Sequence, residues 1–163
     1  MNFRQGGNIM IKQVRVDYRL LHGQVAVSWT ANLGADCILL VSDTLLDDPV
    51  RVTAVKLARP AGVKVVVKNT KDSIAALKSG ITDKYKLFIV CETIEAAKEV
   101  IEAIGYKELN LGGTRPGEGK KEIGTVVYVS PEETEMLKEL INRGVNVYMQ
   151  MVPEKKRVDI KKL

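Results

Sequence analysis

The sequence predicts an α/β protein: a single domain with a mostly parallel, open sheet of about seven strands and helices on both faces. The first indication is the regular alternation of short apolar runs with longer amphipathic runs. The second is that several of the short runs are almost entirely apolar, which is typical of strands buried on both faces of a sheet. The connections are short and the composition does not shift, so we predict one domain over residues 10–163, preceded by a loose polar extension over residues 1–9.

Length and composition exclude several classes of protein. The chain has 163 residues, of which 45% are hydrophobic and 28% are charged, which is enough for a sizeable core. No apolar run reaches the roughly 18 residues that a membrane-spanning helix needs. The net charge is +5, but the few aromatic residues are not interleaved with basic ones, so nucleic-acid binding is not predicted. Cys37 and Cys91 lie in or at the end of apolar runs and are expected to be buried and reduced.

The first strand is predicted at residues 11–17, IKQVRVD. A helix follows from about Gly23, because apolar residues recur there at intervals of four, and Gly34 is placed to end it. The apolar stripe of this helix consists of Val25, Trp29 and Leu33.

The second strand is predicted at residues 37–42, CILLVS, which are nearly all apolar. Asp48 is suited to cap the next helix, with Pro49 at its first position, where the missing N–H of proline costs nothing. Pro60 and Gly62 end this helix. Its inward face is predicted to consist of Val50, Ala54, Leu57 and Ala58.

The third and fourth strands are predicted at residues 63–68 and 87–91, which are short apolar runs. A helix follows each of them, beginning near Thr70 and near Thr93, and a glycine ends each helix. The inward residues and terminal glycines are Ile74, Leu77 and Gly80 in the first of these helices and Ala97, Ile101, Ile104 and Gly105 in the second.

Three further strands complete the predicted sheet. They cover residues 108–113, 125–129 and 145–151, and the glycine-rich run GGTRPGEGKK separates the first two. The tail after Pro153 is predicted to add a last short helix.

The last long helix has a strong start signal in SPEE. Ser130 caps it, Pro131 takes the first helical position, and Glu133 completes a capping box. Its core face and its end are marked by Leu137, Leu140, Ile141 and Gly144.

His22, the only histidine, lies in the loop after the first strand. Loops that follow parallel strands gather at the carboxyl edge of a sheet, which is where ligands bind in open α/β folds. The loops 42–48 and 112–119 follow other strands and are predicted to meet His22 at this edge. They contribute the candidate residues Asp43, Gly112 and Gly113, although a glycine-rich run is more often simply a flexible loop.

The surroundings predicted for His22 suit an anion. The helix that begins at Gly23 and Gln24 presents unpaired N–H groups with partial positive charge, and Arg19 adds a planar fork of donors that matches phosphate oxygens. An imidazole beside such a cradle can bind phosphate as a cation, act as a general acid or base, or accept a phosphoryl group as a nucleophile. The third role needs a neutral ring, which positive surroundings favour. Position alone does not choose among these roles and a plain loop histidine.

Other site motifs are absent from the sequence. Neither GxxxxGK[ST] nor a GxGxxG after the first strand occurs, so nucleotide binding is not predicted. One histidine and two dispersed cysteines do not make a structural zinc site, and no GxSxG nucleophile elbow occurs. No metal and no cofactor are therefore expected.

The segment VRVDYRLLHGQV resembles the active-site signature of a known family, the IIB components of the bacterial sugar phosphotransferase system, in their mannose/fructose/sorbose class. The resemblance covers residues 10–163. The matching signature residues are Asp17, Arg19, Leu20, His22, Gly23 and Gln24. Further similar stretches occur in the family's order: DDPVR, RPAGVKV, ELNLGG, EGKK and VYMQMVP. Thr114 departs from the pattern, because the family often has methionine after the two loop glycines.

The resemblance implies a protein-phosphohistidine–sugar phosphotransferase with no nucleotide, metal or other cofactor. His22 would accept a phosphoryl group at Nδ1 from a phosphohistidine of a IIA protein or domain. It would then transfer the group to a sugar bound by the membrane subunits IIC and IID, and phosphoenolpyruvate would be the upstream source. Arg19 would hold the phosphate. Asp17 would orient Arg19 or the ring, and Asp43 would do likewise or simply cap a turn.

The same resemblance implies a cytoplasmic protein that associates peripherally with the membrane transporter. Two alternatives remain. One is a regulatory domain that senses phosphate or a sugar phosphate through Arg19 and the helix N-terminus without forming a covalent bond. The other is a thiol enzyme that uses Cys91.

Overall fold

The computed structural model describes residues 10–163, so the predicted extension over residues 1–9 lies outside the described residues. Its helices and strands, in chain order, are β1 (Met10–Asp17), α1 (Gly23–Leu33), β2 (Cys37–Val41), the 3₁₀ turn η1 (Leu45–Asp47), α2 (Pro49–Leu57), β3 (Lys64–Lys68), α3 (Thr70–Ser79), β4 (Lys86–Cys91), α4 (Ile94–Ile104), β5 (Glu108–Gly113), β6 (Lys121–Gly124), β7 (Val127–Val129), α5 (Pro131–Asn142), β8 (Asn146–Met149) and β9 (Val158–Asp159).

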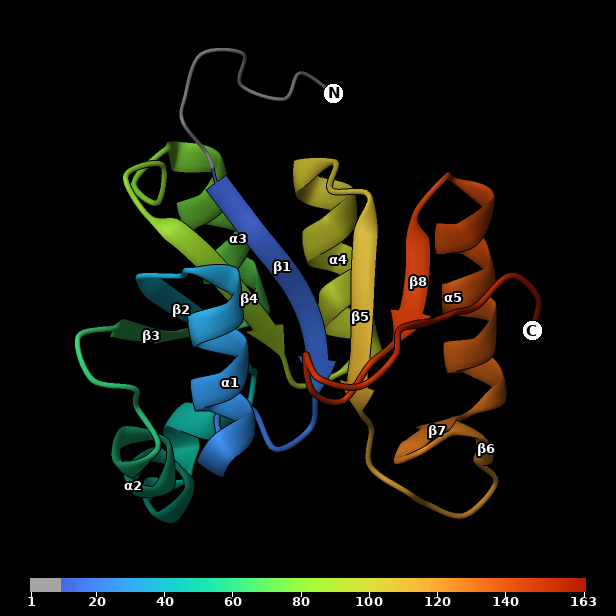
Figure 1. The fold of residues 1–163 in the computed structure, drawn as a ribbon. Helices are drawn as coiled ribbons and strands as arrows, with labels where there is room; N and C mark the ends of the chain where they lie inside the picture. The colour runs from blue at the N-terminus through green and yellow to red at the C-terminus, as the bar shows by residue number, and fades with distance from the viewer. Residues whose placement is uncertain (1–9) are drawn as a thin grey trace.

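Seven strands form the main sheet in the order β3-β2-β4-β1-β5-β8-β9 (Figure 1). All neighbouring strands are parallel except β9, which runs antiparallel to β8. The chain leaves β1 toward β2 on one side and leaves β5 toward β8 on the other. The carboxyl ends of β1 and β5 therefore flank a switch point of the topology, where open α/β sheets bind ligands. The predicted fold class is confirmed.

Helices cover both faces of the sheet. One core packs under α3, α4 and α5, and a second core packs under α1 and α2 (Figure 1). Alternate residues of β1 point to opposite faces. Val14 and Val16 enter the first core, whereas Gln13, Arg15 and Asp17 point to the face that carries α1 and are buried there. A central strand thus buries a row of polar side chains that ends at the loop of His22.

The predicted helix starts are confirmed. The carboxylate of Asp48 accepts a hydrogen bond from Arg51 N at 3.2 Å, and Pro49 is the first residue of α2. The side chain of Ser130 accepts from Glu133 N, and the side chain of Glu133 accepts from Ser130 N, which completes the capping box of α5. Each of these contacts satisfies backbone N–H groups that have no partner within the helix.

The predicted inward face of α2 is wrong at Val50, Ala54 and Leu57, whereas Ala58 packs against the core as predicted. Val50 is 79% exposed and Leu57 is 83% exposed, whereas Val55 is buried at 5% and Val52 packs beside it. The helix has only nine residues and carries apolar side chains on most of its circumference. Periodicity therefore could not decide which arc would face the sheet.

Two predictions for the C-terminal half are also wrong. The strand predicted at 125–129 does not join the main sheet, because β7 pairs antiparallel with β6 in a separate two-stranded sheet. The tail forms β9 on the edge of the main sheet instead of a helix, and the guanidinium of Arg157 stacks 3.7 Å from the ring centroid of Tyr148. This contact with a side chain of β8 favours an extended tail over a helical one.

Nowhere in residues 10–163 does a helix have the length and apolarity that crossing a membrane requires.

Candidate functional site

The loop between β1 and α1 is held in one conformation by its own leucines. Leu20 has a left-handed backbone, with φ of 58°, and its N–H donates to Asp17 O at 2.9 Å. Such a conformation costs about 1 kcal/mol or more for a residue other than glycine, so it persists only where packing enforces it. Leu20 and Leu21 are 4% and 3% exposed and anchor the loop in the core under α1. The next residue, His22, is the N-cap of α1.

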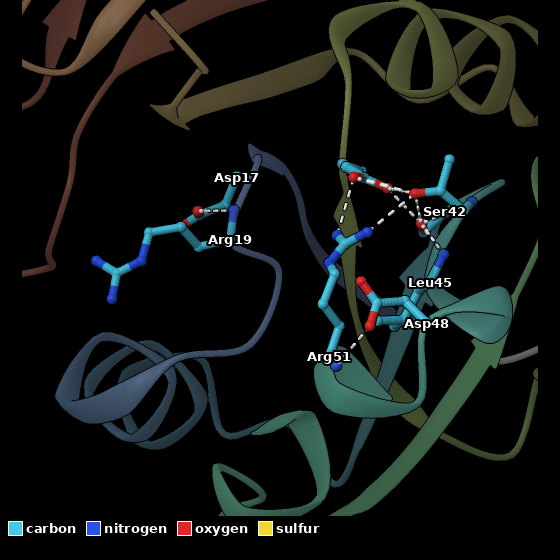
Figure 2. A network of polar contacts seen from close by, with 8 residues as sticks. Asp17, Arg19, Ser42, Leu45, Asp48 and Arg51 are labelled. Carbon is cyan, nitrogen blue, oxygen red and sulfur yellow. Dashed lines mark hydrogen bonds and ion pairs between the residues drawn. The ribbon is translucent and has the colours of Figure 1, made fainter. Parts of the chain in front are cut away.

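Asp17, the last residue of β1, connects three parts of the site. Its Oδ2 lies 2.9 Å from Nε2 of His22 and 3.2 Å from Nη2 of Arg15. Its Oδ1 accepts from the backbone N–H of Arg19 at 3.0 Å (Figure 2). The carboxylate therefore orients the imidazole through the side chain and Arg19 through the backbone. The side chain of Arg19 is exposed and extends away from the loop (Figure 2).

The ionisation of Asp17 fixes which ring nitrogen of His22 carries a proton. Burial alone would raise the pKa of Asp17, but the hydrogen bond with His22, the charge of Arg15 and the N–H of Arg19 bring this pKa below its usual value. An ionised carboxylate only accepts hydrogen bonds, so Nε2 must donate. In the neutral ring the lone pair is then on Nδ1. The side chain of His22 is 17% exposed, so a partner can reach the ring.

The N-terminus of α1 leaves uncapped backbone N–H groups beside this ring. Gly23 and Gln24 are both exposed, and the first intrahelical bond runs from Ala26 N to His22 O. The N–H groups of residues 23–25 therefore have no partner within the helix. The side chain of His22 does not cap them, and the first turn contains no acidic residue. Gly23 has φ of 44°, which glycine adopts without strain.

Arg15 is the main residue of the site that the sequence analysis missed. It is 2% exposed, although it carries a full charge. Its Nη1 donates to Asn110 Oδ1 at 2.5 Å and to Gln150 O at 2.9 Å, and its Nη2 donates to Asp17 and to Met151 O at 3.0 Å. The available signal was the polar alternation of Gln13, Arg15 and Asp17 in a strand that must lie inside the sheet.

The two predicted glycines end β5 beside Arg15 and Asp17. Gly113 pairs with Asp17, and its carbonyl accepts from Tyr18 N at 3.1 Å. A Cβ on Gly112 would lie 2.0 Å from Cζ of Arg15, so only glycine leaves room for the guanidinium. Gly112 therefore makes the burial of Arg15 possible.

Replacing Gly112 with alanine is expected to destabilise the protein by about 3 kcal/mol, because the guanidinium is held by fixed acceptors and cannot move away. Urea unfolding of Gly112→Ala measures this. Gly113→Ala is the matched control, since the nearest atom to its Cβ is 3.8 Å away, and it is expected to cost less than about 1 kcal/mol. Equal losses in the two variants would contradict this role of Gly112.

The second predicted loop, residues 42–48, is held by side-chain hydrogen bonds, and its acidic residue Asp43 bonds to the start of α3. The carboxylate of Asp43 accepts from the N–H and the hydroxyl of Thr70, at 2.8 and 3.1 Å, so it ties the loop to the start of α3. Next to it, Ser42 and Arg51 both donate to the carboxylate of Glu92, which follows β4, and the Arg51 contact is 2.9 Å long (Figure 2). Asp43 thus ties its loop to α3, which is neither of the two roles expected for it, orienting Arg19 or the ring of His22 or capping a turn.

Thr114, which departs from the family pattern, anchors the third loop. Its hydroxyl donates to Tyr128 O at 2.5 Å and accepts from Tyr128 N at 2.6 Å, while its N–H donates to Val126 O. The hydroxyl therefore extends the pairing between the end of β5 and β7. The loop that follows is tied down at its first residue.

The residues that the structure describes do not support a reactive thiol or a metal centre. Cys91 is 0% exposed, and burial raises the pKa of its thiol, which makes it a poor nucleophile. Cys37 is also free and buried. Among residues 10–163, no group of three or more His, Cys, Asp or Glu side chains is placed to hold a metal ion.

Comparison with known proteins identifies the family. The family model described as PTS system sorbose subfamily IIB component matches residues 11–163. The chain is 32% identical over 148 residues to the N-acetylgalactosamine-specific phosphotransferase enzyme IIB component 1 of Escherichia coli (strain K12), covering 90% of this chain and 92% of that protein. It is 27% identical over 156 residues to the mannose-specific EIIAB component of the same strain, covering 93% of this chain and 48% of that protein.

A solved structure agrees with this result. The crystal structure of the IIBSor domain of the sorbose permease from Klebsiella pneumoniae superposes with a TM-score of 0.85 at 27% identity, covering 91% of this chain and 92% of that one. The family model spans nearly all described residues and a relative above 30% identity matches most of the chain. The chain therefore belongs to the sorbose subfamily of IIB components of the phosphotransferase system, which are phosphotransferases of sugar uptake.

Proposed function

We propose that His22 is the phosphate carrier of this IIB component. Its Nδ1 accepts a phosphoryl group from a phosphohistidine of a IIA protein or domain and transfers it to a sugar bound by the membrane subunits IIC and IID. Phosphoenolpyruvate is the upstream source. The observation that carries this proposal is the 2.9 Å contact between Nε2 of His22 and the ionised Asp17, which leaves the lone pair on Nδ1 of a partly exposed ring.

The two transfers are simple exchanges of one bond for another. In the first, the bond between phosphorus and the donor imidazole breaks as the bond to Nδ1 of His22 forms, and the electron pair returns to the donor ring. In the second, a sugar hydroxyl oxygen bonds to phosphorus, the bond to Nδ1 breaks with its electron pair returning to the ring, and the hydroxyl proton passes to solvent water. The protein mainly has to align donor and acceptor and to stabilise the negative oxygens.

The surroundings of His22 suit this task. The uncapped N–H groups at the start of α1 are oriented to receive phosphate oxygens. Arg19 is exposed, so its guanidinium is free to fold onto a phosphate on either His22 or the partner. Its backbone is fixed by Asp17, so the side chain starts from a defined position.

The partners follow from the family. A IIA protein fits the first transfer, and the similarity to a mannose-specific EIIAB component supports a IIA domain as the donor, because this chain matches about half of that relative. IIC and IID would present the sugar. We therefore place this protein in the cytoplasm, peripherally associated with the membrane transporter.

Replacing Arg19 with alanine is expected to slow phosphate transfer about 100-fold, because one charged donor to the transferring group is lost. The fold should be unaffected, since Arg19 is exposed, with a change in the free energy of unfolding below about 0.5 kcal/mol. Rapid-quench transfer from a phosphorylated IIA protein measures the rate. Arg59→Ala, another exposed arginine at the far end of α2, is the matched control and should transfer at the wild-type rate. A wild-type rate in Arg19→Ala would overturn the role of this residue.

Incubation with a phosphorylated IIA protein separates the proposal from its alternative. The proposal predicts a covalent phosphate on this chain, acid-labile and base-stable, that can be passed on to a sugar in membranes containing IIC and IID. Saturable binding of phosphate or a sugar phosphate without covalent label would instead identify a sensing domain.

A further inference from the structure

Arg15 is placed beneath the site as an anchored charge. It is 2% exposed, and its guanidinium reaches four acceptors on three separate segments: β1, β5 and the turn after β8. Its Cζ also lies 5.5 Å from the ring centroid of Trp29, whose Nε1 donates to the same Met151 carbonyl at 2.8 Å. Strands far apart in sequence therefore fix this one side chain.

Burying the guanidinium of Arg15 in this way is an inefficient means of stabilising the fold. Removing a guanidinium from water has a large penalty, and buried ion pairs replaced by apolar residues often leave a protein equally stable. Position 112 must also be glycine, because the guanidinium of Arg15 occupies the space that a Cβ would take. Local features that conflict with a well-packed core tend to mark functional positions. Nη2 of Arg15 contacts the same carboxylate oxygen of Asp17 that contacts Nε2 of His22.

We propose that Arg15 is a positioning residue for phosphate transfer: it holds the carboxylate of Asp17 in the orientation that presents Nδ1 of His22, and its charge limits how strongly that carboxylate draws protons onto the ring. The inference rests on the proposed function of His22. Arg15 itself does not touch the phosphate or the partner, because it is 2% exposed.

Arg15 and His22 share Oδ2 of Asp17. Without Arg15, the imidazole would be the only side chain in contact with this carboxylate, which would then favour a cationic ring whose Nδ1 has no lone pair to attack phosphorus. Arg15, 3.2 Å from the same oxygen, neutralises part of the charge of the carboxylate. The other groups facing this cluster are Arg19, through its backbone N–H, and Tyr148 on β8; the first turn of α1 has no acidic residue.

The test is the pH profile of phosphate acceptance in Arg15→Met, measured against wild type, His22→Gln and a matched control. The profile of Arg15→Met is expected to move to higher pH by about one unit. The rate at saturating IIA should fall at least about ten-fold at neutral pH, while the IIA concentration for half-maximal rate stays unchanged. Arg15→Lys, which returns the charge without the fork, should bring the profile back toward wild type.

Gln13→Met is the matched control, because Gln13 is buried at 5% on the same face of β1 but bonds to Tyr148 rather than to Asp17. It should leave both the profile and the rate unchanged. If Arg15→Met does not fold, the same measurements are made on Asn110→Ala. This variant removes the 2.5 Å contact that holds Nη1 of Arg15. We expect a slower rate and an unchanged IIA concentration for half-maximal rate. Unshifted profiles and wild-type rates in the folded variants would overturn the proposal. If the wild-type protein itself accepts no phosphate, the proposed function of His22 is wrong.

Discussion

Replacing His22 with glutamine is expected to abolish acceptance of phosphate from a phosphorylated IIA protein. The glutamine amide can still donate to Asp17, so the loop and the fold are retained, but it offers no nitrogen lone pair for phosphorus. We expect no acid-labile phosphate above background and a drop in rate of at least about 10⁴-fold, as for the loss of other covalent nucleophiles. Scintillation counting of the chain after separation from IIA measures the label.

The sequence makes this experiment unambiguous, because His22 is the only histidine of the chain. Any acid-labile label that persists in His22→Gln must be on another side chain. Such a label, at a level near that of wild type, would contradict the assignment of His22. Circular dichroism and the melting temperature of the variant establish that a negative result does not come from unfolding.

Replacing Asp17 with asparagine is expected to cost about 3–5 kcal/mol of unfolding free energy at neutral pH, because it leaves the buried Arg15 without its counter-charge. Urea unfolding at pH 7 measures this. Asp43→Asn provides the matched control: Asp43 is exposed, the amide oxygen of asparagine can still accept from the N–H of Thr70, and only the bond from the Thr70 hydroxyl to the second oxygen is lost. The control is expected to lose less than about 1 kcal/mol.

The effect of Asp17→Asn should depend on pH in a defined direction. The pKa of Asp17 in the folded protein lies below its ordinary value of 3.8, so its contribution to stability is complete above about pH 5 and is lost as the pH falls through the folded value. The difference in unfolding free energy between wild type and Asp17→Asn should therefore shrink as the pH falls below about 4. A difference that grows as the pH falls from about 4 to about 2 would show that the carboxylate is not stabilised in the folded state.

The sequence predicted the position of His22 because the signals there are local. A strand-like run, a short loop and a helix start follow one another in VRVDYRLLHGQV, and this order alone puts His22 at the carboxyl edge of a parallel sheet. The helix caps at Asp48 and Ser130 were predicted for the same reason, since a cap depends on residues within one turn.

The surroundings of Arg15 could not be predicted, because they depend on distant segments. The carbonyls of Gln150 and Met151 that bind it are 135 and 136 residues away in sequence. A polar alternation such as Gln13, Arg15 and Asp17 usually marks a face exposed to solvent. Here α1 and the turn after β8 cover that face, so these three polar side chains form a buried network instead. The failed prediction for the face of α2 has a similar cause, since packing against the sheet decides among apolar arcs of comparable strength.

In the phosphorylated protein, phosphate is expected on Nδ1 of His22 while Nε2 remains bonded to Asp17. NMR of the ¹⁵N-histidine-labelled chain, phosphorylated by a IIA protein, tests it directly, because a single imidazole gives a single set of ring signals. We predict phosphorus coupling to Nδ1 and a proton retained on Nε2. Phosphorus coupled to Nε2, or a phosphorylated chain whose ring signals are unchanged, would contradict the account.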